Sequence, residues 1–104
     1  MRVIEDYEGR TIRLTDERLS HILEHPEMRG MEERIAETVR HPEQVLESLS
    51  DPQARLYYRF YVGTPVGDKH LCVAVKLEQN DAFVLTAYLM RKPVGGRQLW
   101  PKRS

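Results

Sequence analysis

The residues best suited to chemistry lie on one short run, Thr86 to Lys92, whose sequence is TAYLMRK. The hydroxyl of Thr86 and the phenol of Tyr88 are two residues apart, so an extended chain points them to the same side. Arg91 and Lys92 follow directly and add two positive charges. Such a group suits a phosphodiester, because fixed positive charge and donors stabilise the negative charge that its transition state develops on oxygen. We therefore predict a nucleotide-binding group in which Tyr88 stacks on a base or donates its phenol.

This run is the second of two apolar-rich stretches in Leu71 to Lys92, joined by the polar corner Gln79-Asn80-Asp81. Both stretches alternate their side chains with a period of two, which predicts an antiparallel hairpin. One face is expected in the core and consists of Leu71, Val73, Val75, Leu77, Phe83, Leu85, Ala87 and Leu89. The other face carries the polar groups and consists of Cys72, Ala74, Lys76, Val84, Thr86, Tyr88 and Met90.

A third strand is predicted from Leu56 to Val62, because aromatic and β-branched residues dominate the sequence LYYRFYV. We expect it to pair beside the Leu71–Lys92 hairpin and to place Tyr57, Arg59 and Tyr61 on the polar face of the sheet, beside His70. A sheet face with cations and aromatic rings suits the binding of phosphates and the stacking of bases. The predicted substrate-binding residues are Arg59, Lys76, Thr86, Lys92 and Tyr57.

His21 is the predicted acid or base. It lies within a predicted helix, and histidine is the side chain that most often exchanges a proton near neutral pH. The alternative is a partly exposed structural histidine. His21 and His25 also form H-x-x-x-H, a spacing found in zinc sites, but no glutamate follows the first histidine and Pro26 disrupts the turn. No metal and no other cofactor is therefore expected.

The remaining elements follow from local patterns. Two short apolar pieces in residues 1–14 predict a small hairpin, and a helix is expected to start at Thr15 or Asp16 and to stop at His25-Pro26. A second helix is expected from Met31 to about Arg40, whereas Val45 to Leu49 fits either a strand or a helical turn. This order predicts an α+β fold, with two helices on one face of an antiparallel sheet.

Composition limits the classes of function. A chain of 104 residues is expected to form one domain, residues 1–104, and 16 basic residues against 16 acidic ones leave no global field that favours nucleic acid or membrane. The single cysteine, Cys72, excludes a disulfide framework within the chain. No stretch approaches about 18 apolar residues, and no signal peptide is visible. A cytoplasmic protein without membrane contact is expected.

Five segments carry a resemblance to a known family: RLTDERLSHILEHPEM, ERIAETVRHPEQVLES, YYRFYVG, LCVAVKL and FVLTAYLMRK. Together they resemble the small phage- and plasmid-borne domains of the barnase/EndoU/colicin/RelE ribonuclease superfamily. The resemblance implies two N-terminal helices packed on a four-stranded or larger antiparallel sheet of RelE-like or barnase-like type. It also implies metal-independent RNA cleavage by transfer to the 2′-hydroxyl, with His21, Thr86, Tyr88, Arg91 and Lys92 as the matching positions.

The resulting hypothesis is a small toxin-type ribonuclease that acts on RNA and is held in check by an antitoxin protein. The predicted catalytic residues are His21, Tyr88 and Arg91. The alternative is a non-catalytic module that binds protein or nucleic acid through the same face. An enzyme is expected to fail on loss of His21 or Arg91, whereas a binding module is expected to tolerate His21→Ala and to lose affinity gradually as cations are removed.

Overall fold

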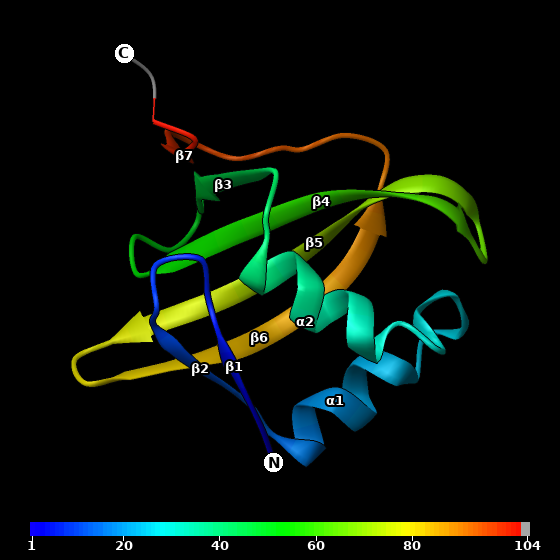
Figure 1. The fold of residues 1–104 in the computed structure, drawn as a ribbon, viewed down its shortest axis with the longest axis horizontal. Coiled ribbons are helices and arrows are strands. Elements are labelled where there is room, and N and C mark those ends of the chain that lie inside the picture. The colour runs from blue at the N-terminus through cyan, green and yellow to red at the C-terminus, as the bar shows by residue number, and fades with distance from the viewer. Residues whose placement is uncertain (103–104) are drawn as a thin grey trace.

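The computed structural model describes residues 1–102, and within them seven strands form one sheet in the order β1-β2-β6-β5-β4-β3-β7 (Figure 1). Neighbouring strands are antiparallel except β2 and β6, which run parallel and pair at Arg13 and Phe83. The strands are β1 (Arg2–Glu5), β2 (Thr11–Leu14), β3 (Gln44–Glu47), β4 (Ala54–Thr64), β5 (Gly67–Glu78), β6 (Asp81–Met90) and β7 (Gln98–Trp100).

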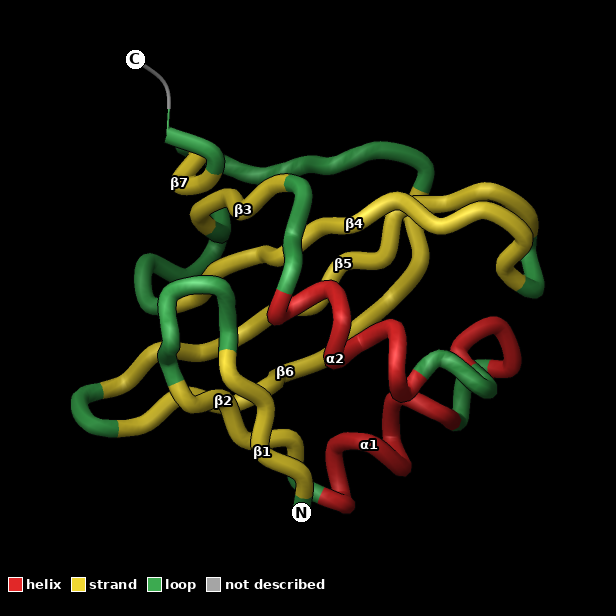
Figure 2. Tube along the Cα trace, viewed as in Figure 1, coloured by secondary structure: helices red, strands yellow, loops and turns green. Residues whose placement is uncertain are grey.

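The helices follow β2 and lie on one face of this sheet, which we call the inner face (Figures 1 and 2). They are α1 (Asp16–Leu23), the 3-10 turn η1 (Pro26–Met28) and α2 (Glu32–Arg40). α1 begins as predicted, because the Thr15 hydroxyl accepts a hydrogen bond from the backbone N–H of Arg18 at 3.1 Å. Both helices end before their His-Pro pairs, as predicted.

The predicted arrangement of two N-terminal helices on an antiparallel, RelE-like or barnase-like sheet is wrong, although the α+β class holds. The hairpin β1–β2 precedes the helices and extends the sheet, and β2 joins β6 in parallel. That parallel pair is possible because α1, η1, α2 and three further strands separate β2 from β6. At the other edge β3 and β7 continue the sheet, and β4 pairs with β3 and, as predicted, with β5 of the central hairpin.

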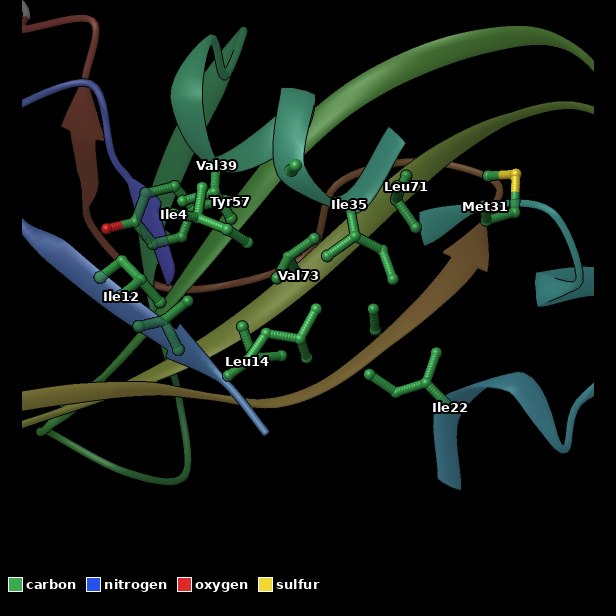
Figure 3. Close-up of a cluster of buried hydrophobic side chains, with 14 of the residues drawn as sticks. Ile4, Ile12, Leu14, Ile22, Met31, Ile35, Val39, Tyr57, Leu71 and Val73 are labelled. Atoms are coloured by element: carbon green, nitrogen blue, oxygen red, sulfur yellow. The ribbon is translucent and has the colours of Figure 1, made fainter. Parts of the chain in front are cut away.

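The main core lies between the helices and the inner face (Figure 3). Ile35 of α2 lies beside Leu71 and Val73 of β5, whereas Val39 of α2 lies beside Ile4 and Tyr57, and Ile22 of α1 is also buried. The other members come from the N-terminal hairpin, from α2 and from the remaining strands and turns. They are Ile4, Ile12, Leu14, Met28, Met31, Ala36, Val45, Tyr57, Val75, Ala82, Val84 and Ala87.

A β-bulge in β6 explains why two residues of the predicted core face, Phe83 and Leu85, do not belong to the core. Ala74 pairs with Thr86, but its neighbour Val75 pairs with Val84, so Leu85 is an extra residue between the two pairs. The alternation therefore changes phase, and Val84 is buried in the core while Phe83 and Leu85 are only partly buried. Strict alternation in the sequence gives no sign of the extra residue.

The predicted faces of β4 are reversed. Tyr57, Arg59 and Tyr61 belong to the inner face, where Tyr57 pairs with Val73 and Arg59 with Leu71. Tyr57, a predicted substrate ligand, is 0% exposed and cannot meet a substrate. Tyr58 is also buried, but it lies on the opposite face, which we call the outer face. Alternation separates the two sets of side chains without telling which set the helices cover.

The buried phenol of Tyr57 is satisfied by Asp6, the polar residue at the start of the β1–β2 turn. Tyr57 donates to Oδ2 of Asp6 at 2.7 Å, and the same oxygen accepts from Nη1 of Arg10 at 3.0 Å. Oδ1 accepts from the backbone N–H groups of Glu8 and Arg10. Burial, and then the bond to Asp6, raise the pKa of Tyr57. This network fastens the turn of the N-terminal hairpin to the middle of the sheet.

Tyr57→Phe is expected to lower the free energy of unfolding by about 1–3 kcal/mol, because it leaves a buried carboxylate oxygen short of one donor. Tyr61→Phe is the matched control, since the Tyr61 hydroxyl bonds the exposed carboxylate of Glu37, which water can solvate instead. Urea unfolding of both variants measures the difference. An equal loss in the two variants would contradict the structural role given to the Asp6 network.

Candidate functional site

The outer face presents three cross-strand rows from β4, β5 and β6. Tyr58, Cys72 and Tyr88 form the central row, because Tyr58 pairs with Cys72 and Cys72 with Tyr88. The flanking rows are Leu56–Ala74–Thr86 and Phe60–His70–Met90. This face therefore brings together Thr86, Tyr88, Cys72 and His70, as the sequence predicted, but with Tyr58 and Phe60 in place of Tyr57 and Arg59.

A cavity of about 520 Å³ opens on this face. Its floor consists of the strand residues Leu56, Tyr58, Ala74, Leu85, Thr86, Tyr88 and Met90. One wall is the turn between β3 and β4, from Ser48 to Asp51, and the other is Val94-Gly95 in the segment after β6. A flat, mainly apolar floor with hydroxyls and a carboxylate at the rim suits a planar ring that carries polar edges.

Tyr58 holds in place the segment after β6, which forms one wall of the cavity. Its hydroxyl donates to the backbone O of Val94 at 2.6 Å and accepts from the backbone N–H of the same residue at 3.2 Å. Burial is the main cause of the raised pKa of Tyr58, so the phenol stays protonated and able to donate. These two bonds hold the segment from Pro93 to Gly96 over the edge of the outer face.

Gly95 is required for this close approach. A Cβ at this position would lie 2.9 Å from Cβ of Leu46 and 3.0 Å from the backbone O of Glu47, which is closer than such contacts are normally found. At Gly96 the nearest atom would be 3.5 Å away, an ordinary contact. The segment after β6 can therefore lie against β3 only because residue 95 has no side chain.

Gly95→Ala is expected to push the segment off β3, widen the cavity and cost about 1–3 kcal/mol of stability, as overpacking does. Gly96→Ala is the control, and no loss is expected from it because its new methyl group has room. Thermal unfolding of both variants gives the comparison. Two variants with the same stability would show that the segment does not press on β3 as described.

Tyr88 stands at the mouth of the cavity with 40% of its surface exposed. Partial burial, and then the neighbouring thiol of Cys72, raise the pKa of Tyr88 to about 12. Its phenol is therefore a proton donor at neutral pH. Thr86 is exposed on the same strand and lines the same cavity, so its hydroxyl is available to a ligand.

His70 is the titratable ring on this face, at the position diagonal to Tyr88 across β5 and β6. Its Nδ1 lies 3.2 Å from the backbone O of Arg91, and its ring packs edge-on against Phe60 with centroids 5.0 Å apart. A proton on Nδ1 donates to that carbonyl, which leaves Nε2 as the acceptor. The sequence placed His70 on this face but assigned the acid or base role to His21.

The predicted cations are distributed over different places. Lys76 lies at the far end of the outer face and forms an ion pair with Asp51, whose pKa it lowers. Arg59 lies on the inner face, where it donates to the backbone O of His41 at 2.7 Å and pairs with Glu37 at 3.6 Å. Arg91 and Lys92 follow β6 and are exposed.

The side chain of His21 forms no hydrogen bond or ion pair with the outer-face residues within residues 1–102. Its side chain is 66% exposed, and its ion-pair partner is Glu24, at 3.5 Å on the same helix. Its neighbour Ile22 packs into the main core and α1 packs against β6, but no hydrogen bond joins His21 to Tyr88 or Thr86 within the described residues. The structure thus brings Tyr88 and Thr86 to one face, leaves Lys92 exposed after β6, and leaves His21 on the helix surface.

Comparison with known proteins gave no match: no family model, no curated protein and no solved structure is significantly similar to this chain. Neither α1 nor α2, the α-helices of the described residues, is long and apolar enough to cross a membrane.

Proposed function

We propose that this protein binds single-stranded RNA on the outer face and cleaves it without a metal ion. The observation that carries the proposal is the placement of His70 and Tyr88 on diagonal positions beside an aromatic-floored cavity. Diagonal residues of neighbouring strands are roughly 7–8 Å apart, which leaves space for one phosphodiester between an acid and a base. The motif resemblance to the barnase/EndoU/colicin/RelE superfamily supports the same activity.

In the proposed reaction the 2′-oxygen of a ribose attacks phosphorus and the bond from phosphorus to the 5′-oxygen breaks. The products are a 2′,3′-cyclic phosphate and a free 5′-hydroxyl. Nε2 of His70 accepts the proton of the 2′-hydroxyl, and the phenol of Tyr88 donates its proton to the leaving 5′-oxygen. Lys92 supplies positive charge for the phosphate oxygens, and the cavity holds the adjacent base against the floor residues.

A ribonuclease of this kind acts in the cytoplasm and requires an inhibitor, the antitoxin, in the cell that produces it. The outer face offers such a partner a set of apolar side chains that are at least 40% exposed: Leu49, Phe60, Val62, Tyr88 and Val94. A protein that covered them would block the cavity directly. The same exposed side chains favour the second candidate function, a module that binds a protein partner and has no catalytic activity.

Cleavage of a single-stranded oligoribonucleotide in the presence of a metal chelator tests the enzyme proposal. His70→Ala is expected to lower the rate by about 10²- to 10⁴-fold, the usual contribution of a general acid or base. Tyr88→Phe removes the proton donor and is expected to fall in the same range, whereas His21→Ala is expected to stay close to wild type. Detection of the 2′,3′-cyclic phosphate by mass spectrometry identifies the reaction.

Two outcomes would contradict different parts of this proposal. A wild-type protein that is folded and leaves the RNA intact would rule out the enzyme and leave the binding module. Activity that survives His70→Ala but disappears in His21→Ala would move the acid or base role from the outer face to α1.

A further inference from the structure

The charged residues are paired unevenly over the molecule. Seven arginine and lysine side chains form ion pairs with carboxylates within residues 1–102: Arg2, Arg10, Arg13, Arg55, Arg59, Lys76 and Arg97. In contrast, eight cations form no ion pair within residues 1–102: Arg18, Arg29, Arg34, Arg40, Lys69, Arg91, Lys92 and Lys102. Of these, Lys69 lies in β5 near the β4–β5 turn, Arg91 follows the end of β6, and Arg34 lies in α2. The β4–β5 turn and the end of β6 are at the right of Figure 1.

Tyr61 connects Arg34 and Lys69. The guanidinium of Arg34, in the first turn of α2, lies 4.9 Å from the centre of the Tyr61 ring, which is cation–π distance. Tyr61 pairs with Lys69 across β4 and β5. Between β5 and β6, Leu71 pairs with Leu89 and His70 with Met90. Lys69 and Arg91 are the next residues beyond the His70–Met90 pair.

Lys69 lies on the same face of the sheet as the ring of Tyr61. It is two residues from the core residue Leu71 on β5, so it extends the inner face. The contact of His70 Nδ1 with the backbone O of Arg91, at 3.2 Å, keeps Arg91 beside β5. Arg34 and Lys69 therefore flank Tyr61, and Arg91 follows at the neighbouring end of β6.

The carboxylate in this neighbourhood is already occupied. Oε1 of Glu37 accepts a hydrogen bond from the Tyr61 hydroxyl at 2.5 Å and pairs with Nε of Arg59 at 3.6 Å. On the hairpin tip, the Asp68 carboxylate accepts from the backbone N–H of Gly63. The positive charge of Arg34, Lys69 and Arg91 is thus left for an external anion. Arg34 and Lys69 are only partly exposed.

We propose that Arg34, Lys69 and Arg91 form a second anion site, which binds backbone phosphates of the single-stranded nucleic acid whose base occupies the outer-face cavity. This site rests on the proposed function, and it adds the route that the nucleic-acid strand follows over the protein surface. The strand leaves the cavity past Tyr88 and Lys92, passes the end of β6 and reaches the inner-face cations. A dinucleotide would be too short to reach both sites, so the expected substrate is a longer single strand.

The test is binding of a fluorescent, non-cleavable oligodeoxynucleotide to the full chain over a range of salt concentrations. For single strands, the slope of log K against log salt changes by about 0.7 for each phosphate neutralised. The double variant R34Q/K69Q is therefore expected to reduce the slope by roughly 1.4. The matched control R18Q/R40Q removes two charges that also lack an ion pair in residues 1–102 but lie on other parts of α1 and α2, and it is expected to leave the slope unchanged.

A second variant distinguishes the loss of positive charge from misfolding of the protein. R34K/K69R keeps both charges and is expected to keep the wild-type slope, and thermal unfolding confirms that all variants are folded. The proposal is overturned if R34Q/K69Q has the same slope as R18Q/R40Q, or if the wild-type chain binds no oligonucleotide. Because the probe is not cleaved, a wild-type chain that binds it with the expected slopes but cleaves no RNA would support this site and overturn the enzyme proposal alone.

Discussion

The structure depends on the burial of two adjacent tyrosines on opposite faces of β4. Tyr57 is 0% exposed and Tyr58 is 1% exposed, so β4 must be covered on both sides. The phenol of Tyr57 needs Asp6 and thereby fixes the N-terminal hairpin over the inner face. The phenol of Tyr58 needs the backbone of Val94 and thereby fixes the segment after β6 over the outer face. One dipeptide therefore holds both the N-terminal hairpin and the segment after β6 against the sheet.

The candidate site is a consequence of this arrangement. A bare sheet face would be flat, but the segment held by Tyr58 and the turn between β3 and β4 form two walls around the central rows. Tyr88 and His70 then stand where the covered part of the outer face gives way to solvent. In this position a base can be excluded from water in the cavity while the phosphate remains near the exposed cation Lys92. Separate places for the base and for the phosphate suit the sequence-tolerant stacking of single-stranded nucleic acids.

Local elements were predictable from the sequence because each has a short-range cause. The Thr15 cap, the two His-Pro stops and the Asn80 turn, where φ is 63°, all follow from residue chemistry. The sheet order was not predictable, because it depends on pairings between distant segments. β7 spans only Gln98–Trp100, too short for a periodic pattern.

The candidate site was predictable only in part for the same reason. Alternation correctly grouped Thr86, Tyr88, Cys72 and His70, since cross-strand neighbours follow from the hairpin. It could not reveal the bulge at Leu85, and it could not tell that Tyr58, not Tyr57, lies beside Cys72. The role of His70 depends on its contact with a backbone oxygen of Arg91, which no residue pattern encodes.

The central claim is that the outer face is the nucleotide-binding surface. Its most direct test is a titration of ¹⁵N-labelled protein with a short, 2′-deoxy-substituted RNA analogue, followed by proton–nitrogen correlation NMR. The account predicts that the largest shifts map to the outer-face rows and to the segment after β6, with Thr86, Tyr88 and Val94 foremost. Shifts confined to α1 around His21, or no shifts at all, would contradict it.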